Sequence, residues 1–132
     1  DSPKCMNQTL EFRTHPGLFF AGQITGVEGY VESTSGGLIA GINAVRKMRG
    51  QELLVVPSST ATGALLRYIS DPERKNFQPM NVSYGLVESY AQAATRDARG
   101  KKIGKKERRI ETAEKALAIT ESLILEWGVR NA

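Results

Sequence analysis

Residues 18–48 read LFFAGQITGVEGYVESTSGGLIAGINAVRKM, and this stretch decides the fold class that we predict. The short apolar run LFFAG is followed by a glycine-rich loop from Gln23 to Gly29, and apolar residues then recur at helical spacing up to Met48. Gly50 is the expected stop of this helix. An apolar run bounded by glycine favours a buried parallel strand. The order strand, glycine-rich loop, helix therefore predicts an α/β protein.

Three further glycines lie inside the predicted helix. Glycine in a helix interior costs about 1 kcal/mol relative to alanine, so Gly36, Gly37 and Gly41 together give up roughly 3 kcal/mol of local preference. We expect that another part of the protein, or a cofactor, approaches this backbone closely.

The loop before the helix has the glycine pattern of a binding turn, although its spacing is unusual. Gly22, Gly26 and Gly29 give G-x-x-x-G-x-x-G, whereas the dinucleotide-binding turn is G-x-G-x-x-G. The start of a helix presents unpaired N–H groups and the positive end of a dipole, which suits an anion or an electron-rich ring edge. The alternative is that the glycines only shape a tight turn.

The rest of the chain gives weaker strand signals and two further helix signals. Alternation predicts a short strand at 9–13, and a second strand is predicted at 80–86. Caps and apolar spacing predict a helix at about 60–70, and a longer one over 105–127 that ends at Gly128. The apolar stripe of this last helix consists of Ile110, Ala113, Leu117, Thr120, Ile124 and Trp127, widened by Ala116, Ile119 and Leu123.

Composition and charge narrow the class of protein. The chain has 132 residues, about one domain, with 40% hydrophobic and 24% charged residues. We see no apolar run long enough for a membrane helix and no leader at the start, and the single cysteine, Cys5, fits a reducing compartment. We therefore expect a cytoplasmic protein that needs no membrane. Cys5 is expected to be incidental.

The net charge of +4 is concentrated in one segment. Residues 96–109, RDARGKKIGKKERR, contain eight basic and two acidic residues. Such a segment is either a solvated charge run or a surface for nucleic-acid phosphates. The glycines at 100 and 104 predict that its first part is a flexible loop.

Four sequence blocks in order carry a resemblance to a known family. FFAGQITGVEGYVES, GLIAGINAVR, GALLRYI and NFQPMNVSYGL together resemble the C-terminal part of the folate- and flavin-dependent tRNA uracil-5 methyltransferases of the glucose-inhibited division protein A family. The resemblance covers about residues 2–127, and the closing basic segment and helix fit it as well. The family's chains are considerably longer, so the sequence is identified as a C-terminal fragment.

The resemblance implies a fold and a domain division. The fold would be α/β, the C-terminal part of a Rossmann-like FAD-binding domain made of short strands and about three helices. Its sheet would be incomplete without the missing N-terminal part. Residues 1–90 would belong to the FAD-binding domain, and residues 91–132 would form a basic loop and an amphipathic helix. Because a lone strand exposes unpaired backbone groups, we expect self-association or a need for the missing part.

The resemblance also implies an activity and its cofactors. The whole enzyme would bind FAD, reduce it with NADH or NADPH, and use methylenetetrahydrofolate to methylate C5 of a T-loop uridine in tRNA. The fragment alone is expected to be inactive, with no catalytic residue and no metal ligand assigned to it. The family's cofactor contacts, carried over to this sequence, fall on Gly22, Gln23, Gly26, Val27, Glu28, Gly29 and Tyr30.

With a tRNA substrate implied, the basic segment is interpreted as an RNA contact. The expected contacts are Lys101, Lys102, Lys105, Lys106, Arg108 and Arg109. Two other functions stay open. One is a noncatalytic nucleic-acid-binding module, which has no need of the glycine loop. The other is the related flavoprotein that builds carboxymethylaminomethyl groups at the wobble uridine, against which the NFQPMNVSYGL block and the short C-terminus speak.

Overall fold

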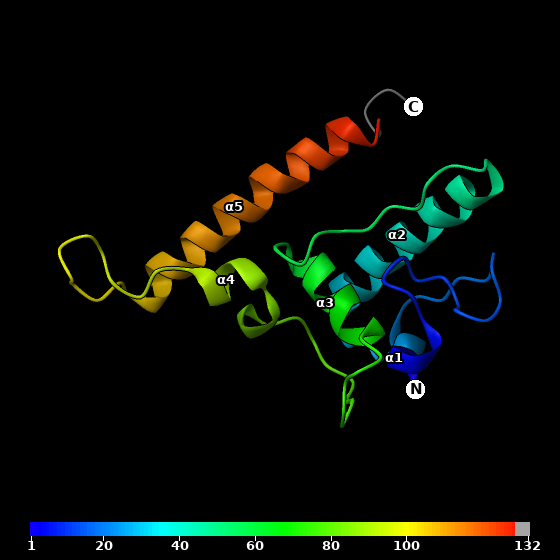
Figure 1. Cartoon of the computed structure of the whole chain (residues 1–132), viewed down its shortest axis with the longest axis horizontal. Coiled ribbons are helices and arrows are strands. Elements are labelled where there is room, and N and C mark those ends of the chain that lie inside the picture. The colour runs from blue at the N-terminus through cyan, green and yellow to red at the C-terminus, as the bar shows by residue number, and fades with distance from the viewer. Residues whose placement is uncertain (129–132) are drawn as a thin grey trace.

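The structure, a computed structural model, describes residues 1–128 and is mainly helical in this range (Figure 1). No helix in this range combines the length and the apolar character that crossing a membrane requires. In chain order the elements are α1 (Ser2–Cys5), η1 (Gln23–Thr25), α2 (Tyr30–Met48), α3 (Ala61–Ser70), η2 (Tyr84–Leu86), α4 (Glu88–Gln92) and α5 (Lys105–Glu126), where η marks a 3-10 turn.

The three predicted helices are confirmed, together with the residues that end them. The chain leaves α2 through Gly50, whose φ of +65° is the left-handed conformation that glycine accommodates. At the start of α3, the Thr60 hydroxyl accepts a hydrogen bond from the Gly63 N–H at 3.1 Å, as expected of an N-cap. Gly128, with φ +69°, follows α5. Local signals therefore suffice for these helices.

The predicted strands are wrong within the described residues. Residues 9–13 and the LFFAG run form only isolated bridges, among them Glu11 with Phe19 in antiparallel orientation. At 80–86, Met80 makes one parallel bridge to Val27, and the chain then turns into η2. A strand needs neighbours that pair its N–H and C=O groups, and residues 1–128 supply too few. Leu18, expected to be buried, is 46% exposed. The described chain is thus helical with a few bridges.

The two short helices, α1 and α4, were not predicted. Each covers at most five residues, so neither completes enough turns to show a periodic apolar face. Their place is visible in Figure 1, where α1 lies with α2 and α3, and α4 lies at the N-terminal end of α5.

The core lies where α1, α2 and α3 meet the segments around Leu10 and Val56. Leu10, Leu66 and Ile69 are its most deeply buried large side chains. Gly63 lets α3 pack directly on the extended segment before it, because a Cβ there would lie 2.0 Å from the Pro57 carbonyl oxygen. Residues 51–57 run extended.

Two buried polar side chains fasten the segments around this core. Asn43 on α2 has no exposed surface; its Nδ2 donates to the Thr9 and Leu54 carbonyls at 3.0 Å, and its Oδ1 accepts from the Leu54 N–H at 2.7 Å. The Glu11 carboxylate accepts from Lys47 Nζ at 2.9 Å and from the Gly17 N–H at 2.7 Å. The hydrogen bond from Lys47 holds the pKa of Glu11 below its ordinary value.

Candidate cofactor and nucleic-acid sites

The glycine-rich loop folds back onto the segment that contains Met80. The Glu28 N–H donates to the Met80 carbonyl and the Met80 N–H donates to the Gly26 carbonyl, each at 3.1 Å. The Val27 side chain between these bonds is buried. The loop is therefore held in place by residues of this chain.

The backbone conformation requires glycine at all three loop positions, and at two of them a Cβ would also come too close to a neighbouring side chain. Gly26 has φ +84°, and a Cβ there would lie 2.3 Å from Phe77 Cζ. Gly29 has φ +91°, and a Cβ there would lie 2.4 Å from a carboxylate oxygen of Glu32. The tight-turn interpretation accounts for both. Gly22 is different, since its φ of +78° needs glycine but no atom lies within 4 Å of its Cβ position.

The loop presents its other side to solvent. Gln23, Glu28 and Tyr30 are exposed, Tyr30 at 91%, whereas Thr25 and Val27 point inward. Gly29 is the N-cap of α2 and provides no side-chain cap, so the first N–H groups of this 19-residue helix have no intrahelical partner. Unpaired N–H groups and a helix dipole at one point can receive an anion or an electron-rich ring edge.

One exposed residue of this region was missed from the sequence. Ile24, in the middle of the loop, is 74% exposed and lies six residues before Tyr30. A single apolar residue in a loop gives no periodic signal. Its exposure places an apolar contact beside the polar Gln23, as a surface that meets both polar and apolar parts of a partner would require.

The helix glycines do not face the neighbour that the sequence predicted. Gly36 is buried, with Leu10 Cδ1 at 4.0 Å from its Cβ position, but no atom of the chain lies within 4 Å of the Cβ positions of Gly37 and Gly41. The exposed Leu38, Val45 and Met48 lie on the same helix. The expected close approach to Gly37 and Gly41 is thus absent within residues 1–128.

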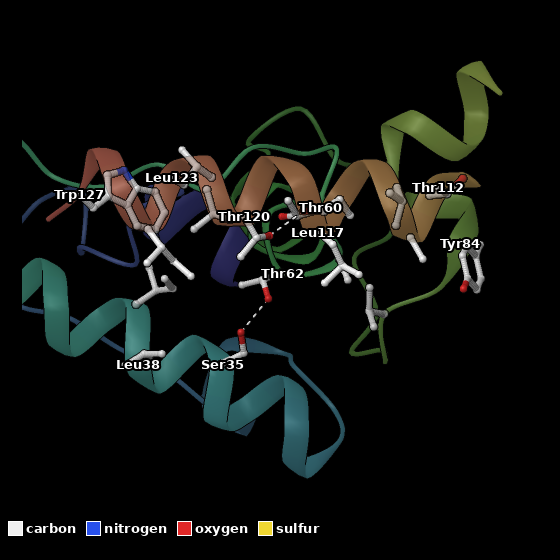
Figure 2. A pocket seen from close by; sticks show the side chains of 18 of the residues that line it. Ser35, Leu38, Thr60, Thr62, Tyr84, Thr112, Leu117, Thr120, Leu123 and Trp127 are labelled. Carbon is white, nitrogen blue, oxygen red and sulfur yellow. Dashed lines mark hydrogen bonds between the residues drawn. The ribbon is translucent and has the colours of Figure 1, made fainter. Parts of the chain in front are cut away.

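A largely apolar groove separates α5 from α2 and α3 (Figure 2). It encloses about 740 Å³ and is lined on one side by the predicted stripe of α5, from Ala113 to Trp127. On the other side, the Ser35 and Thr62 hydroxyls are hydrogen-bonded to each other at 2.7 Å. The α5 stripe therefore faces a cavity along much of its length, and Trp127 packs against the core at its far end.

The first part of the basic segment is a hairpin with its own hydrogen bonds. Arg96 bridges Lys102, and the Asp97 carboxylate accepts from the N–H groups of Arg99 and Lys101 at 2.9 Å. Gly100 occupies the turn with φ +77°, while Gly104 is the N-cap of α5. The loop predicted there therefore has a defined turn in the structure, with a backbone role for each of its two glycines.

The basic side chains fall into two groups. Lys101, Lys102, Lys105 and Lys106 are exposed, and within residues 1–128 none of them makes an ion pair. Arg108 is half-buried: its Nη2 donates to the Tyr90 carbonyl at 2.9 Å and its guanidinium lies 4.5 Å from the Tyr90 ring centre. Arg109 is exposed over the Tyr84 ring. The lysines are thus free to meet a partner, whereas Arg108 already holds α5 to α4.

The start of α5 is electrostatically unfavourable for a helix. A cation in the first turn of a helix costs about 0.3–1 kcal/mol, and Lys105, Lys106 and Arg108 lie in the first turn of α5. Glu107 offsets part of this cost, since its carboxylate accepts from the Gly104 N–H at 3.1 Å. A bound polyanion would offset the rest.

Nothing in the described range points to a metal site or a reactive thiol. Among residues 1–128 no three His, Cys, Asp or Glu side chains gather closely enough to hold a metal ion. Cys5 is partly buried and packs against the core.

Comparison with known proteins identifies relatives over almost the whole chain. Residues 1–52 match the family model described as glucose inhibited division protein A. Over 124 residues, 94% of this chain, it is 48% identical to the methylenetetrahydrofolate–tRNA-(uracil-5-)-methyltransferase TrmFO of Natranaerobius thermophilus and 48% identical to that of Streptococcus agalactiae. The TrmFO of Streptococcus gordonii is 49% identical over 117 residues. The chain spans about a quarter of the length of these relatives, 25% to 27%.

Proposed function

Since this chain is related to the TrmFO enzymes of the glucose-inhibited division protein A family, we propose that it is the C-terminal part of a tRNA-methylating flavoenzyme. The complete enzyme would methylate C5 of a T-loop uridine, with methylenetetrahydrofolate as carbon donor and NADH or NADPH as reductant. The piece alone would bind and position but not catalyse. The observation that carries this proposal is the uncapped start of α2 beside an outward-facing loop.

The loop and the helix start would form part of an FAD site. When bound, FAD would supply the electrons that turn the transferred carbon into a methyl group. The backbone N–H groups at Gly29 and Tyr30 lie at the positive end of α2, where they would stabilise negative charge on the ring edge of a reduced flavin. The Glu28 N–H is already bonded to the Met80 carbonyl, so Glu28 would contribute only its exposed side chain. Gln23 is exposed and would supply a neutral hydrogen-bonding side chain; Val27 would contribute backbone only.

Residues 1–90 would accordingly complete an FAD-binding domain, and residues 91–132 would provide a tRNA-contacting arm. The exposed, unpaired lysines of the hairpin and of the α5 start support this division. Each phosphate that a lysine neutralises releases counterions, so such a segment adds affinity that falls steeply with salt. Arg109 would belong to this contact, whereas Arg108 would orient α5.

FAD titration, followed by absorbance and flavin fluorescence, tests the cofactor assignment. We expect binding when this chain is mixed with the remaining part of a TrmFO relative, and none or little with the chain alone, because a split site needs both pieces. Gln23→Ala should weaken binding in the mixture. Gln51→Ala is the matched control, since Gln51 is also exposed but lies beyond α2. Lack of FAD binding in every mixture would contradict the assignment.

One observation favours the second candidate function, a noncatalytic nucleic-acid-binding module. The glycine loop packs on its own core through Val27 and Met80, so its shape requires no cofactor. Affinity for a tRNA transcript as a function of salt tests the contact that both functions share. Lys101→Gln with Lys105→Gln should reduce the slope of log affinity against log salt by about 0.7–0.9 for each phosphate that the variant no longer neutralises. Arg67→Gln with Lys75→Gln removes the same charge from exposed positions elsewhere and should change the slope little.

A further inference from the structure

Two arginines and two tyrosines gather where α5 begins. Tyr84 comes from η2, Tyr90 from α4, and Arg108 and Arg109 from the first turns of α5. The two tyrosine ring centres are 5.3 Å apart at an angle of 53°, and each ring has one guanidinium over it, at 4.5 Å for Arg108 and 5.1 Å for Arg109. Residues from three elements thus form one aromatic and cationic cluster beside the basic segment.

The two halves of the cluster differ in how firmly they are held. Arg108 is half-buried and hydrogen-bonded to the Tyr90 carbonyl, and Tyr90 is half-buried as well. Arg109 and Tyr84 are both exposed, Tyr84 at 38%, and within residues 1–128 Arg109 makes no ion pair. The inner pair therefore fixes α4 against α5, and the outer pair is supported by it while still facing solvent.

The position of Tyr84 matters as much as its exposure. In Figure 2 it lies near Thr112, at the end of the groove toward the start of α5. The exposed Lys105 and Lys106 belong to the first turn of α5. Aromatic rings and guanidinium planes stack with unpaired nucleobases, whereas paired bases inside a helix are not accessible for such stacking. Exposed lysines at the start of the same helix would bind the RNA backbone near that base.

We propose that Tyr84, with Arg109 over its ring, is a stacking platform for an unpaired base of the tRNA. This rests on the proposed tRNA contact of the basic segment and adds what that contact lacks, a preference for single-stranded over double-stranded RNA. Tyr84 is the base-contacting residue; Tyr90 and Arg108 are positioning residues that keep η2, α4 and the start of α5 together.

The test compares Tyr84 variants on two RNAs, a tRNA transcript and a blunt RNA duplex of similar length. Tyr84→Leu keeps an apolar side chain but removes the aromatic face, so affinity for the tRNA should fall roughly 10-fold. Because no charge is removed, the slope of log affinity against log salt should stay unchanged, and affinity for the duplex should not alter. Tyr84→Phe keeps the ring and should bind both RNAs as the unsubstituted chain does.

The outcomes separate this inference from the proposed function. If the lysine variants lose tRNA affinity but Tyr84→Leu does not, the stacking platform is wrong and the phosphate contact stands. If Tyr84→Leu weakens tRNA and duplex equally, Tyr84 only supports the helix, and the inference is overturned. If the lysine variants change nothing, the tRNA contact itself fails, and the platform fails with it. Thermal unfolding of each variant, followed by circular dichroism, shows whether the fold is kept.

Discussion

At the scale of single residues, Asn43 holds three segments together although nothing in the sequence around it indicates this role. It is fully buried on α2 and is hydrogen-bonded to the Thr9 carbonyl and to both the N–H and the carbonyl of Leu54. Asn43→Ala leaves one N–H and two carbonyl groups in the core without partners. Since each such group costs about 1–3 kcal/mol, we expect the free energy of unfolding to fall by about 3 kcal/mol in a urea titration. Asn81→Ala, at an exposed asparagine, should change it by less than about 0.5 kcal/mol. Equal effects of the two substitutions would contradict this role.

Why the sequence predicts some residues and not others is also clear at this scale. Gly50 and Gly128 take up conformations that local chemistry demands, and both were predicted as helix ends. Asn43 could not be identified, because its hydrogen-bond partners are 34 and 11 residues away in the chain. The exposed basic residues were predictable as a charged segment. The sequence does not show that Arg108 is half-buried while its basic neighbours are exposed. This difference arises from its hydrogen bond to Tyr90, eighteen residues earlier, and from the turn that brings the two residues together.

At the scale of elements, α2 carries a feature that the described chain does not use. Gly37 and Gly41 meet no atom within 4 Å of their Cβ positions, although glycine weakens a helix. Gly37→Ala and Gly41→Ala should therefore each raise the free energy of unfolding of this chain by about 0.5–1 kcal/mol in a urea titration. The same substitutions should weaken its association with the remaining part of a TrmFO relative, measured by calorimetric titration, because a methyl group would fill the space for a close backbone. Gly36→Ala is the control, since Gly36 faces Leu10 in the core and should leave association unchanged. Association that tolerates all three substitutions would show that nothing approaches this face.

Helices and strands differed in how far the sequence could predict them. The α2, α3 and α5 helices were predicted within one or two residues, because a helix satisfies its backbone hydrogen bonds within itself. A strand satisfies its backbone hydrogen bonds with another segment. The apolar run LFFAG therefore indicates only that these residues would suit a sheet if a partner strand were present. Within residues 1–128 its Phe19 finds a single bridge, to Glu11. The part of the candidate cofactor site formed by the first turn of α2 was predictable, because it depends on the same local signals as the helix. The pairing of the glycine-rich loop with Met80 was not, because it depends on a distant segment.

At the scale of the whole molecule, the chain exposes more surface than its mass requires. Its accessible surface is 8602 Å², whereas a compact monomer of 14.4 kDa exposes roughly 6,800 Å². Part of the excess is apolar: Val31 and Met48 on α2 and Leu125 on α5 are each more than half exposed. Large exposed apolar areas mark surfaces that bind a partner or associate with each other. In a protein of the length of these relatives, about four times that of this chain, further residues would be available to cover this surface.

Sedimentation of the chain alone should therefore show dimers or larger species at micromolar concentration, because water leaves the apolar faces of α2 when two copies meet. Adding the remaining part of a TrmFO relative should replace these species by a complex with one copy of each, since the two associations would use the same face. Val31→Gln with Met48→Gln should reduce self-association, whereas Leu125→Gln, which alters a comparably exposed side chain on α5, should reduce it less.

If the unsubstituted chain sediments as a compact monomer, the exposed face of α2 is compatible with water as it stands, and the need for a covering partner is disproved. If the Leu125 variant alone dissociates the oligomer, the contact lies on α5, so the glycine face of α2 would remain free for the remaining part of a TrmFO relative.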